Sequence, residues 1–301
     1  MGLNVPAHYV TQYSTNVQLL LQQKGSKLRD TVSIGMHTGE AAVPVEQIGA
    51  IEAKVRAGRG SPVVFTDSPE TRRWVEPIDY DTDAEIIDSA DKLRMLIDPQ
   101  SSYVTNAVYA LGRKIDDVVI AAATATAKIG ENSTSGTEAF DTATYQVTGS
   151  IGGTNSGLNV AKLRAARRKL QEAFVDLDQE QPTLVITARQ HDDLLNEIQV
   201  ISTDFGAAQA PVLVEGRIRR FLGINFVHTQ LLTTGTDDAA GTSTACPLWV
   251  PSGMYYGNWQ TAMTDISQRK DLQGLPWQAY VSMTGGATRL EKERVVRIWC
   301  R

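Results

Sequence analysis

One long helix constrains the fold of this chain more than any other feature of its sequence. Asp98 can cap a helix, Pro99 suits its first turn, and Gly130 can end it. About 30 residues rising roughly 1.5 Å each would form a rod of about 45 Å. The sequence therefore predicts a helix over Pro99–Ile129, which is long for a globular domain. The heptads are not sustained long enough to favour the alternative, a coiled coil. Apolar residues recur at helical spacing along it: Val104, Val108, Leu111, Ile115, Val118 and Ala122.

Shorter helices and strands follow the long helix. Apolar spacing predicts a second helix that begins at Asn159 and continues through Phe174 and Leu177. A buried strand over Thr183–Thr187 leads into a third helix, for which Thr187 and Gln190 have capping-box spacing. This order of elements predicts an α+β fold. Further strands are expected at Val212–Val214, Arg217–Phe221, Ile224–Thr229, Leu248–Val250, Tyr280–Met283 and Val295–Trp299.

The N-terminal part of the chain contains little that could form a core. Residues 1–29 are polar and rich in Gln and Asn, as in an arm that packs on another surface. Residues 31–80 hold only short apolar runs broken by Gly and Pro. Because thin strands alone cannot bury a core, we expect an extended hairpin that needs a partner surface.

Composition and charge exclude several classes of protein. With 42% hydrophobic residues the chain can build a packed core, so wholesale disorder is excluded. A formal charge of -5 disfavours a protein that wraps nucleic acid with its whole surface. The sequence shows no run of apolar residues long enough for a membrane helix and no N-terminal leader pattern, so we expect synthesis in a cytoplasm and no membrane partner.

Residues that could carry catalysis or bind a metal are sparse. The four histidines lack partners at metal-ligand spacing, and Cys246 and Cys300 lack a CxxC neighbour. We therefore expect no catalytic site, no metal and no cofactor. Both cysteines are interpreted as reduced structural thiols, with Cys300, one residue from the end, expected to be the more exposed.

Acidic residues alternate along one segment of the chain. An EF-hand loop also begins with such acids, but Ala84 and Ala90 replace its glycine and its closing glutamate. A period of two instead predicts a strand with its acids on one face, which is either solvated or docked on a basic partner. These acids are Asp79, Asp81, Asp83 and Glu85.

Two segments have the opposite charge. Lys54, Arg56 and Arg59 lie in the middle of the predicted hairpin with no acid among them. We hypothesise that this basic segment of one subunit docks on the acidic strand of a neighbour, the alternative being that both are solvated. The second helix is also basic and could touch nucleic acid, although a solvated face or a subunit contact is the simpler interpretation. Its bases are Lys162, Arg164, Arg167, Arg168 and Lys169.

The order of these elements resembles the major capsid protein of tailed bacteriophages, with the Hong Kong 97-type coat fold. The resemblance covers nearly the whole chain, and its local motifs matter through their order. They are Arg72-Arg73-Trp74 before Tyr80 and Asp81, Asp91 and Arg94 before Asp98-Pro99, Ala110-Leu111-Gly112-Arg113 and Asp116-Asp117 on the long helix, Gly216-Arg217-Ile218 before Leu222-Gly223-Ile224-Asn225-Phe226, and Gly285-Gly286-Ala287-Thr288-Arg289 before the last strand.

The resemblance implies a division of the chain into five parts. Residues 1–35 would form an N-terminal arm and 36–86 an extended loop. Residues 87–157 would form a peripheral domain with a spine helix over 99–129. Residues 158–270 would form the axial domain, and 271–301 strands that return to the peripheral domain.

The resemblance also implies a function and partners. The chain would assemble into pentamers and hexamers of an icosahedral shell around phage DNA, contacted without sequence specificity, in a virion assembled in the host cytoplasm. Scaffolding, portal and decoration proteins are the other partners implied. Some relatives cross-link their shells through Lys and Asn, and Lys54 is the only lysine in the loop that could do so.

Two other classes remain open at this point. An encapsulin-like cellular compartment shares the coat fold, and a cargo-docking surface would distinguish it. A soluble oligomeric α+β enzyme is the second, disfavoured by the missing catalytic constellation and the unsupported arm and hairpin.

Overall fold

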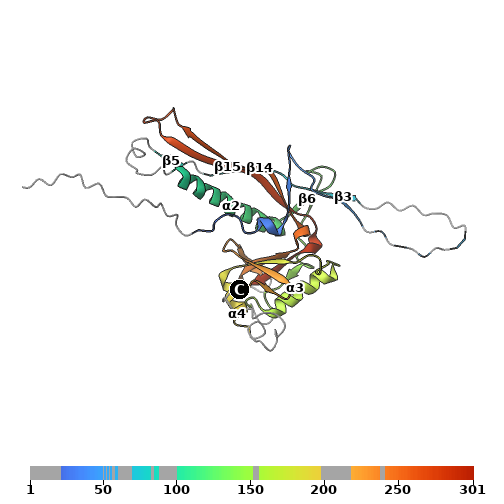
Figure 1. Cartoon of the computed structure of the whole chain (residues 1–301). Coiled ribbons are helices and arrows are strands. Elements are labelled where there is room, and N and C mark those ends of the chain that lie inside the picture. Colours follow the sequence, from blue (N-terminus) through green and yellow to red (C-terminus); the bar gives the residue numbers. More distant parts are fainter. Residues whose placement is uncertain are drawn as a thin grey trace, which may run out of the picture. The chain divides into compact units, whose positions relative to one another are not determined.

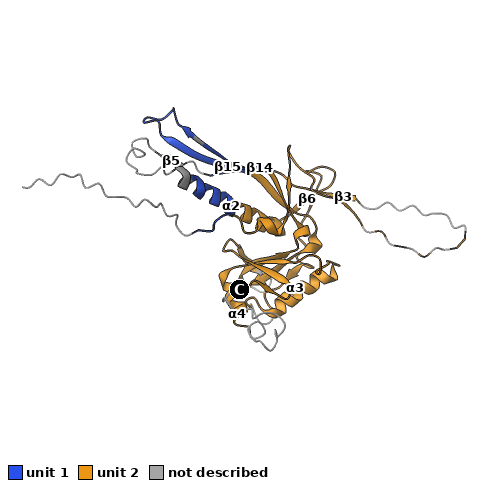
Figure 2. Cartoon of the chain, viewed as in Figure 1, with its two compact units in different colours: residues 1–25, 79–113, 260–283 blue, residues 26–78, 114–259, 284–301 orange. Residues whose placement is uncertain are grey.

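A computed structural model describes residues 22–49, 51, 53, 55, 58–59, 70–82, 85–87, 100–151, 156–197, 218–237 and 241–301. The chain divides into two units, each made of three separate stretches of sequence (Figure 2). One unit comprises residues 1–25, 79–113 and 260–283. The other comprises residues 26–78, 114–259 and 284–301.

The long helix is present as α2, over Gln100–Thr124 (Figure 1). The predicted start at Pro99 lies outside the described residues, but the predicted end at Ile129 is wrong. Residues Ala127–Ile129 instead form strand β6, which pairs with β3 (Glu70–Trp74). The Arg289 guanidinium donates to the oxygen of Ala123 in the last turn of α2 at 3.1 Å and to that of Ala125, just after the helix, at 3.0 Å, so it satisfies carbonyls that the helix end leaves without a partner. Sequence spacing could not show this distant partner.

A seven-stranded mixed sheet forms the core of the larger unit. Its order is β10-β11-β9-β13-β16-β8, with β12 paired to β13. Helices α3 (Val160–Glu172) and α4 (Ala188–Leu195) contribute apolar side chains to the same core. The strands are β8 (Gln146–Val147), β9 (Thr183–Ile186), β10 (Arg220–Phe221), β11 (Ile224–His228), β12 (Thr234–Asp237), β13 (Gly241–Trp249) and β16 (Val295–Cys300). The predicted strands at 183–187, 224–229, 248–250 and 295–299 are confirmed. The strand expected over Arg217–Phe221 is only the two-residue β10, because residues 218 and 219 are not in a strand. The strand expected at 212–214 lies outside the described residues.

The caps that begin the two short helices are the predicted ones. The Asn159 side chain accepts the Lys162 amide at 2.8 Å, and Thr187 and Gln190 form a capping box. The end of α3 differs from the prediction, because the helix stops at Glu172 instead of continuing through Phe174 and Leu177. The amide of Val175 folds back to the Leu170 oxygen at 3.1 Å, which closes the helix.

A second sheet has the order β1-β14-β15-β4, with β5 also paired to β15. The predicted strand at 280–283 lies within β15 and is confirmed. The single acidic strand expected over 79–85 is instead two strands, β4 and β5, with Thr82 donating its amide to Val281 at 2.9 Å between them. The bounds are β1 (Ser33–Met36), β4 (Ile78–Asp81), β5 (Glu85–Ile87), β14 (Met254–Gln268) and β15 (Trp277–Arg289).

Four short strands make a third sheet in the larger unit, in the order β2-β3-β6-β7. β2 spans Glu46–Ile48 and β7 spans Gly136–Glu138. The Trp74 indole donates to the Gly130 oxygen at 2.8 Å, so β3 is tied to the turn after β6. Three 3-10 turns complete the described elements: η1 (Arg29–Thr31), η2 (Pro251–Gly253) and η3 (Lys292–Arg294).

Candidate inter-subunit surfaces

The basic segment of the predicted hairpin is described only in part. Lys54 and Arg56 lie outside the described residues, while Arg59 is exposed. Val55, between them in sequence, has 97% of its surface exposed, and Ile51 is also exposed. The apolar residues described here are therefore uncovered in the isolated chain, as expected of a segment that packs on another subunit.

The acidic set is divided between two strands. Asp79 and Asp81 are exposed on β4, Glu85 is on β5, and Asp83 lies outside the described residues. A hydrogen bond with Asp81 raises the pKa of Tyr280, so one of these carboxylates already faces a side chain of its own sheet. The two exposed aspartates remain accessible to a cationic partner.

The five bases of α3 have different environments. Lys162 is fully buried and donates to the carbonyl oxygens of Ser156 and Trp299 at 2.6 and 2.9 Å. Arg167 donates to Leu222, and Lys169 donates to Thr144. These three are used within the chain, which leaves two exposed arginines on the other side of the helix, Arg164 and Arg168.

A buried carboxylate on α2 holds the end of the N-terminal segment. Asp116 has no exposed surface, and it accepts the Ser26 hydroxyl at 2.5 Å and the backbone amides of Lys27 and Leu28 at about 3.0 Å. Leu28 is itself fully buried. Residues 26–28 are therefore fixed on α2.

The smaller unit holds the preceding residues by side-chain contacts. Arg113 donates to the Gln22 side chain at 2.7 Å and to the Gln23 carbonyl at 3.2 Å. The Gln22 amide donates to Asn106 at 2.8 Å. Residues 22–23 are thus tied to α2 by polar contacts.

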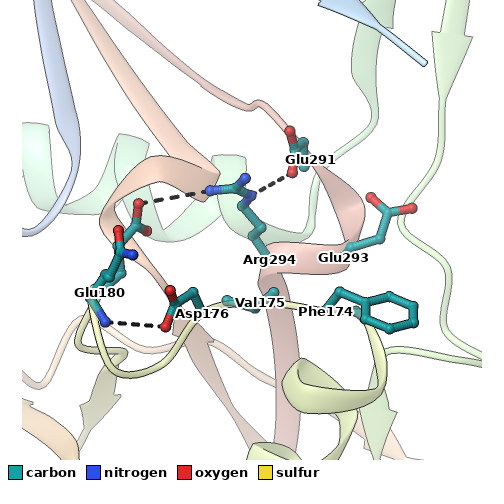
Figure 3. Close-up of a pocket in the computed structure, with 9 residues that line it drawn as sticks. Phe174, Val175, Asp176, Glu180, Glu291, Glu293 and Arg294 are labelled. Carbon is teal, nitrogen blue, oxygen red and sulfur yellow. Dashed lines mark hydrogen bonds and ion pairs between the residues drawn. The ribbon is translucent and has the colours of Figure 1, made fainter. Parts of the chain in front are cut away.

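A small pocket of about 280 Å³ opens after the end of α3 (Figure 3). Arg294 lies between two acids, donating to Glu291 and lying 3.8 Å from Glu180. Asp176 accepts the amides of Asp178 and Gln179 in its own turn. The residues labelled in the close-up are Phe174, Val175, Asp176, Glu180, Glu291, Glu293 and Arg294.

Among the residues that the structure describes, no group of three or more His, Cys, Asp or Glu could hold a metal ion. Cys246 and Cys300 are free thiols, and both are fully buried. The expectation that Cys300 is the more exposed is wrong, because β16 lies between β13 and β8 and carries its terminal residues into the core. Among the described helices, none has the length and apolar character needed to cross a bilayer.

Solved structures with the same fold are phage capsids. The capsid of cyanophage P-SCSP1u is 14% identical, with a TM-score of 0.73 over 98% of this chain and 93% of that chain. The capsid of Helicobacter pylori bacteriophage KHP30 is 10% identical, with a TM-score of 0.72 over 100% and 98%. The capsid of cyanophage Pam1 is 12% identical, with a TM-score of 0.71 over 99% and 98%. No curated protein matches the sequence.

The sequence matches the phage capsid protein family over residues 5–301. The chain belongs to the phage capsid protein family. This capsid protein has the Hong Kong 97-like coat fold and is a major capsid protein that forms an icosahedral shell. Its location is the virion, and its role is structural.

Two features of the capsid protein were not predicted from its sequence. Asp116 was recognised only as part of a motif, although a carboxylate between Ile115 and Val119 on the apolar face of a helix could have suggested a buried anchor. Phe174 was assigned to a helix face, because no glycine follows Glu172 to mark the end of that helix.

Proposed function

We propose that this capsid protein assembles as pentamers and hexamers, and that the shell encloses double-stranded phage DNA held by non-specific contacts. The family match over residues 5–301 carries this proposal. The exposed apolar residues of the hairpin segment support it, since an isolated chain leaves Val55 and Ile51 in water. Scaffolding, portal and decoration proteins are proposed as further partners, and the host cytoplasm as the place of assembly. No catalysis is required for any of these steps.

The chain is proposed to divide its work among five parts. Residues 1–35 act as the arm, 36–86 as the extended loop and 87–157 as the peripheral domain. Residues 158–270 act as the axial domain, and 271–301 return to the peripheral domain except for β16, which pairs with β13 in the seven-stranded sheet. The contacts of the buried Asp116 with Lys27 and Leu28 hold this part of the arm on α2.

The two charged surfaces are proposed to meet between subunits. Lys54, Arg56 and Arg59 of one subunit would dock on Asp79, Asp81, Asp83 and Glu85 of a neighbour. The exposure of Arg59, Asp79 and Asp81 supports this contact. Exposed ion pairs are worth under about 1 kcal/mol each. Repetition around a closed shell makes such a small energy significant.

Electron microscopy of the purified chain tests shell formation directly. The expected result is closed particles in negative stain, together with capsomer-sized species in gel filtration. A chain that stays a small oligomer at every concentration, with no particles in the microscope, would contradict the proposal.

Charge reversal tests the docking of the two surfaces. Arg56→Glu with Arg59→Glu should block assembly while the fold persists by circular dichroism. Adding Asp79→Arg and Asp81→Arg should restore assembly in part. Reversing Arg189 and Arg301, which are also exposed, provides a control with the same change in net charge. Assembly should also weaken toward about 1 M salt, where the screening length falls to roughly 3 Å.

A further inference from the structure

Phe174 is unfavourable in two respects, the exposure of its ring and the conformation of its backbone. It has 97% of its surface exposed, and its backbone φ is 59°, in the left-handed region. This position after a helix usually holds glycine, because a side chain there is strained. A large aromatic ring in water adds a second cost. The backbone cost is offset by the hydrogen bonds that close the helix, from the Phe174 amide to Gln171 and from the Val175 amide to Leu170. The exposure of the ring is not offset in the described part of the chain, which favours a benefit outside its own subunit.

The pocket beside Phe174 is small. Its volume of about 280 Å³ is below the range of roughly 300–1,000 Å³ that is usual for small-molecule sites. Figure 3 shows the ring of Phe174 at one side of the pocket and Glu293 above it. An inserted side chain would therefore meet an aromatic ring and carboxylates together.

The charge of the pocket selects a cation. Asp176, Glu180, Glu291 and Glu293 give it four carboxylates against the single guanidinium of Arg294. Arg294 is directed to Glu291 and Glu180, while Asp176 accepts only backbone amides and Glu293 makes no ion pair within the described residues. A second guanidinium fits best, because it binds carboxylates through its planar fork and stacks on an aromatic face.

The same chain presents suitable arginines on α3. Arg164 and Arg168 are four residues apart, so they lie on one face of the helix. Arg164 makes no ion pair or side-chain hydrogen bond within the described residues. Arg168 makes only an exposed pair with Glu172 at 3.3 Å, a kind of contact that contributes little. The opposite face, with Leu163, Ala166 and Leu170, is buried.

We propose that Phe174 and its acidic pocket receive an arginine from the exposed face of α3 in a second copy of this chain. The proposal rests on the shell-forming function and names one contact within it. The contact joins two different surfaces of identical chains, so it is heterologous and can repeat around a ring of subunits. It is separate from the docking of the hairpin segment, which uses other acids.

Phe174→Gly gives the most direct test. Glycine suits the left-handed backbone, so the isolated chain should fold at least as well as the wild type. Assembly should nevertheless weaken, with the protein concentration needed for shells rising about tenfold, equivalent to about 1.4 kcal/mol. If Phe174 acted only within its own subunit, the glycine variant would not combine unimpaired folding with weaker assembly. An unchanged assembly threshold would overturn the proposal, whereas a wild type that forms no shells would instead contradict the proposed function.

A charge exchange tests the partner. Arg164→Glu with Arg168→Glu should raise the assembly threshold, and adding Glu293→Arg should lower it again. Arg189→Glu, at an exposed position on α4, serves as the control and should leave the threshold unchanged. Failure of Glu293→Arg to lower the threshold would count against α3 as the source.

Photo-cross-linking identifies the occupant independently. Benzoylphenylalanine placed at position 174 in otherwise wild-type shells should cross-link to peptides containing residues 161–172 of another copy. Cross-links to residues 54–59, or none between copies, would overturn the proposed partner.

Discussion

The Asp116 carboxylate accepts the backbone amide of Leu28 at 3.0 Å, across 88 positions of sequence. Both residues are fully buried, so the contact is shielded from water. It joins the long helix to a residue of the proposed arm. The same carboxylate binds Ser26 and Lys27, which makes it the anchor of this segment.

Asp116→Asn should lower the free energy of unfolding by about 2–3 kcal/mol. The side-chain NH2 group that replaces one carboxylate oxygen is itself a donor, so it cannot accept hydrogen bonds from the backbone amides of Lys27 and Leu28. Hydrogen exchange at Lys27 and Leu28 should accelerate, as measured by mass spectrometry on unassembled protein. The neighbouring Asp117→Asn is the matched control. Burial raises the pKa of Asp117, so its charge is disfavoured in the folded chain and its removal should not destabilise. Equal losses in the two variants would contradict the anchor.

Arg289→Met should destabilise the chain by about 3 kcal/mol, because buried carbonyl oxygens lose their donor. The guanidinium is fully buried and serves Ala123, Ala125 and Glu138. Denaturant unfolding measures the loss. Arg164→Met, at an exposed position, should change stability by less than about 0.5 kcal/mol. A similar small effect for Arg289 would show that the helix end does not depend on it.

The thiols of Cys246 and Cys300 should react with a disulfide reagent on the order of 100-fold more slowly in the native chain than in denaturant. Both are fully buried, and their mutual hydrogen bond together with burial raises the pKa of Cys246. Thiolate, the reactive form, is thereby disfavoured. Ser267→Cys introduces an exposed thiol as a positive control. Rapid native labelling of Cys300 would mean that β16 opens readily.

Asp271 should titrate near pH 2. Its hydrogen bonds with Arg269, at 2.8 and 2.6 Å, lower its pKa from 3.8 to about 2. The pKa of Asp271 is lower in the folded chain than in the unfolded chain. The pair therefore stabilises the fold at any pH above the unfolded-state pKa, and this stabilisation is lost as the pH falls through about 2. Carboxyl chemical shifts in unassembled protein measure the value. Arg269→Gln should return it toward 3.8, whereas Arg189→Gln should leave it in place.

Local signals in the sequence predict the structure correctly wherever a short stretch determines its own conformation. The caps at Asn159 and Thr187 were predicted because each cap residue forms hydrogen bonds with the residue three positions later. The strands around Ile224 and Val295 were predicted from apolar runs that only a buried sheet explains. The order of these elements was enough to suggest the coat fold.

Partners far along the chain decided what the sequence alone did not determine. The Arg289 guanidinium satisfies a carbonyl at the end of α2, Asp116 anchors residues 26–28, and Cys300 is buried because neighbouring strands enclose it. Periodicity describes one element at a time, whereas each of these outcomes joins residues 50 or more positions apart in the sequence. The left-handed backbone of Phe174 is the sharpest case. Its apolar character indicated a helix face, and only the closing bond from Val175 to Leu170 turns the ring into solvent.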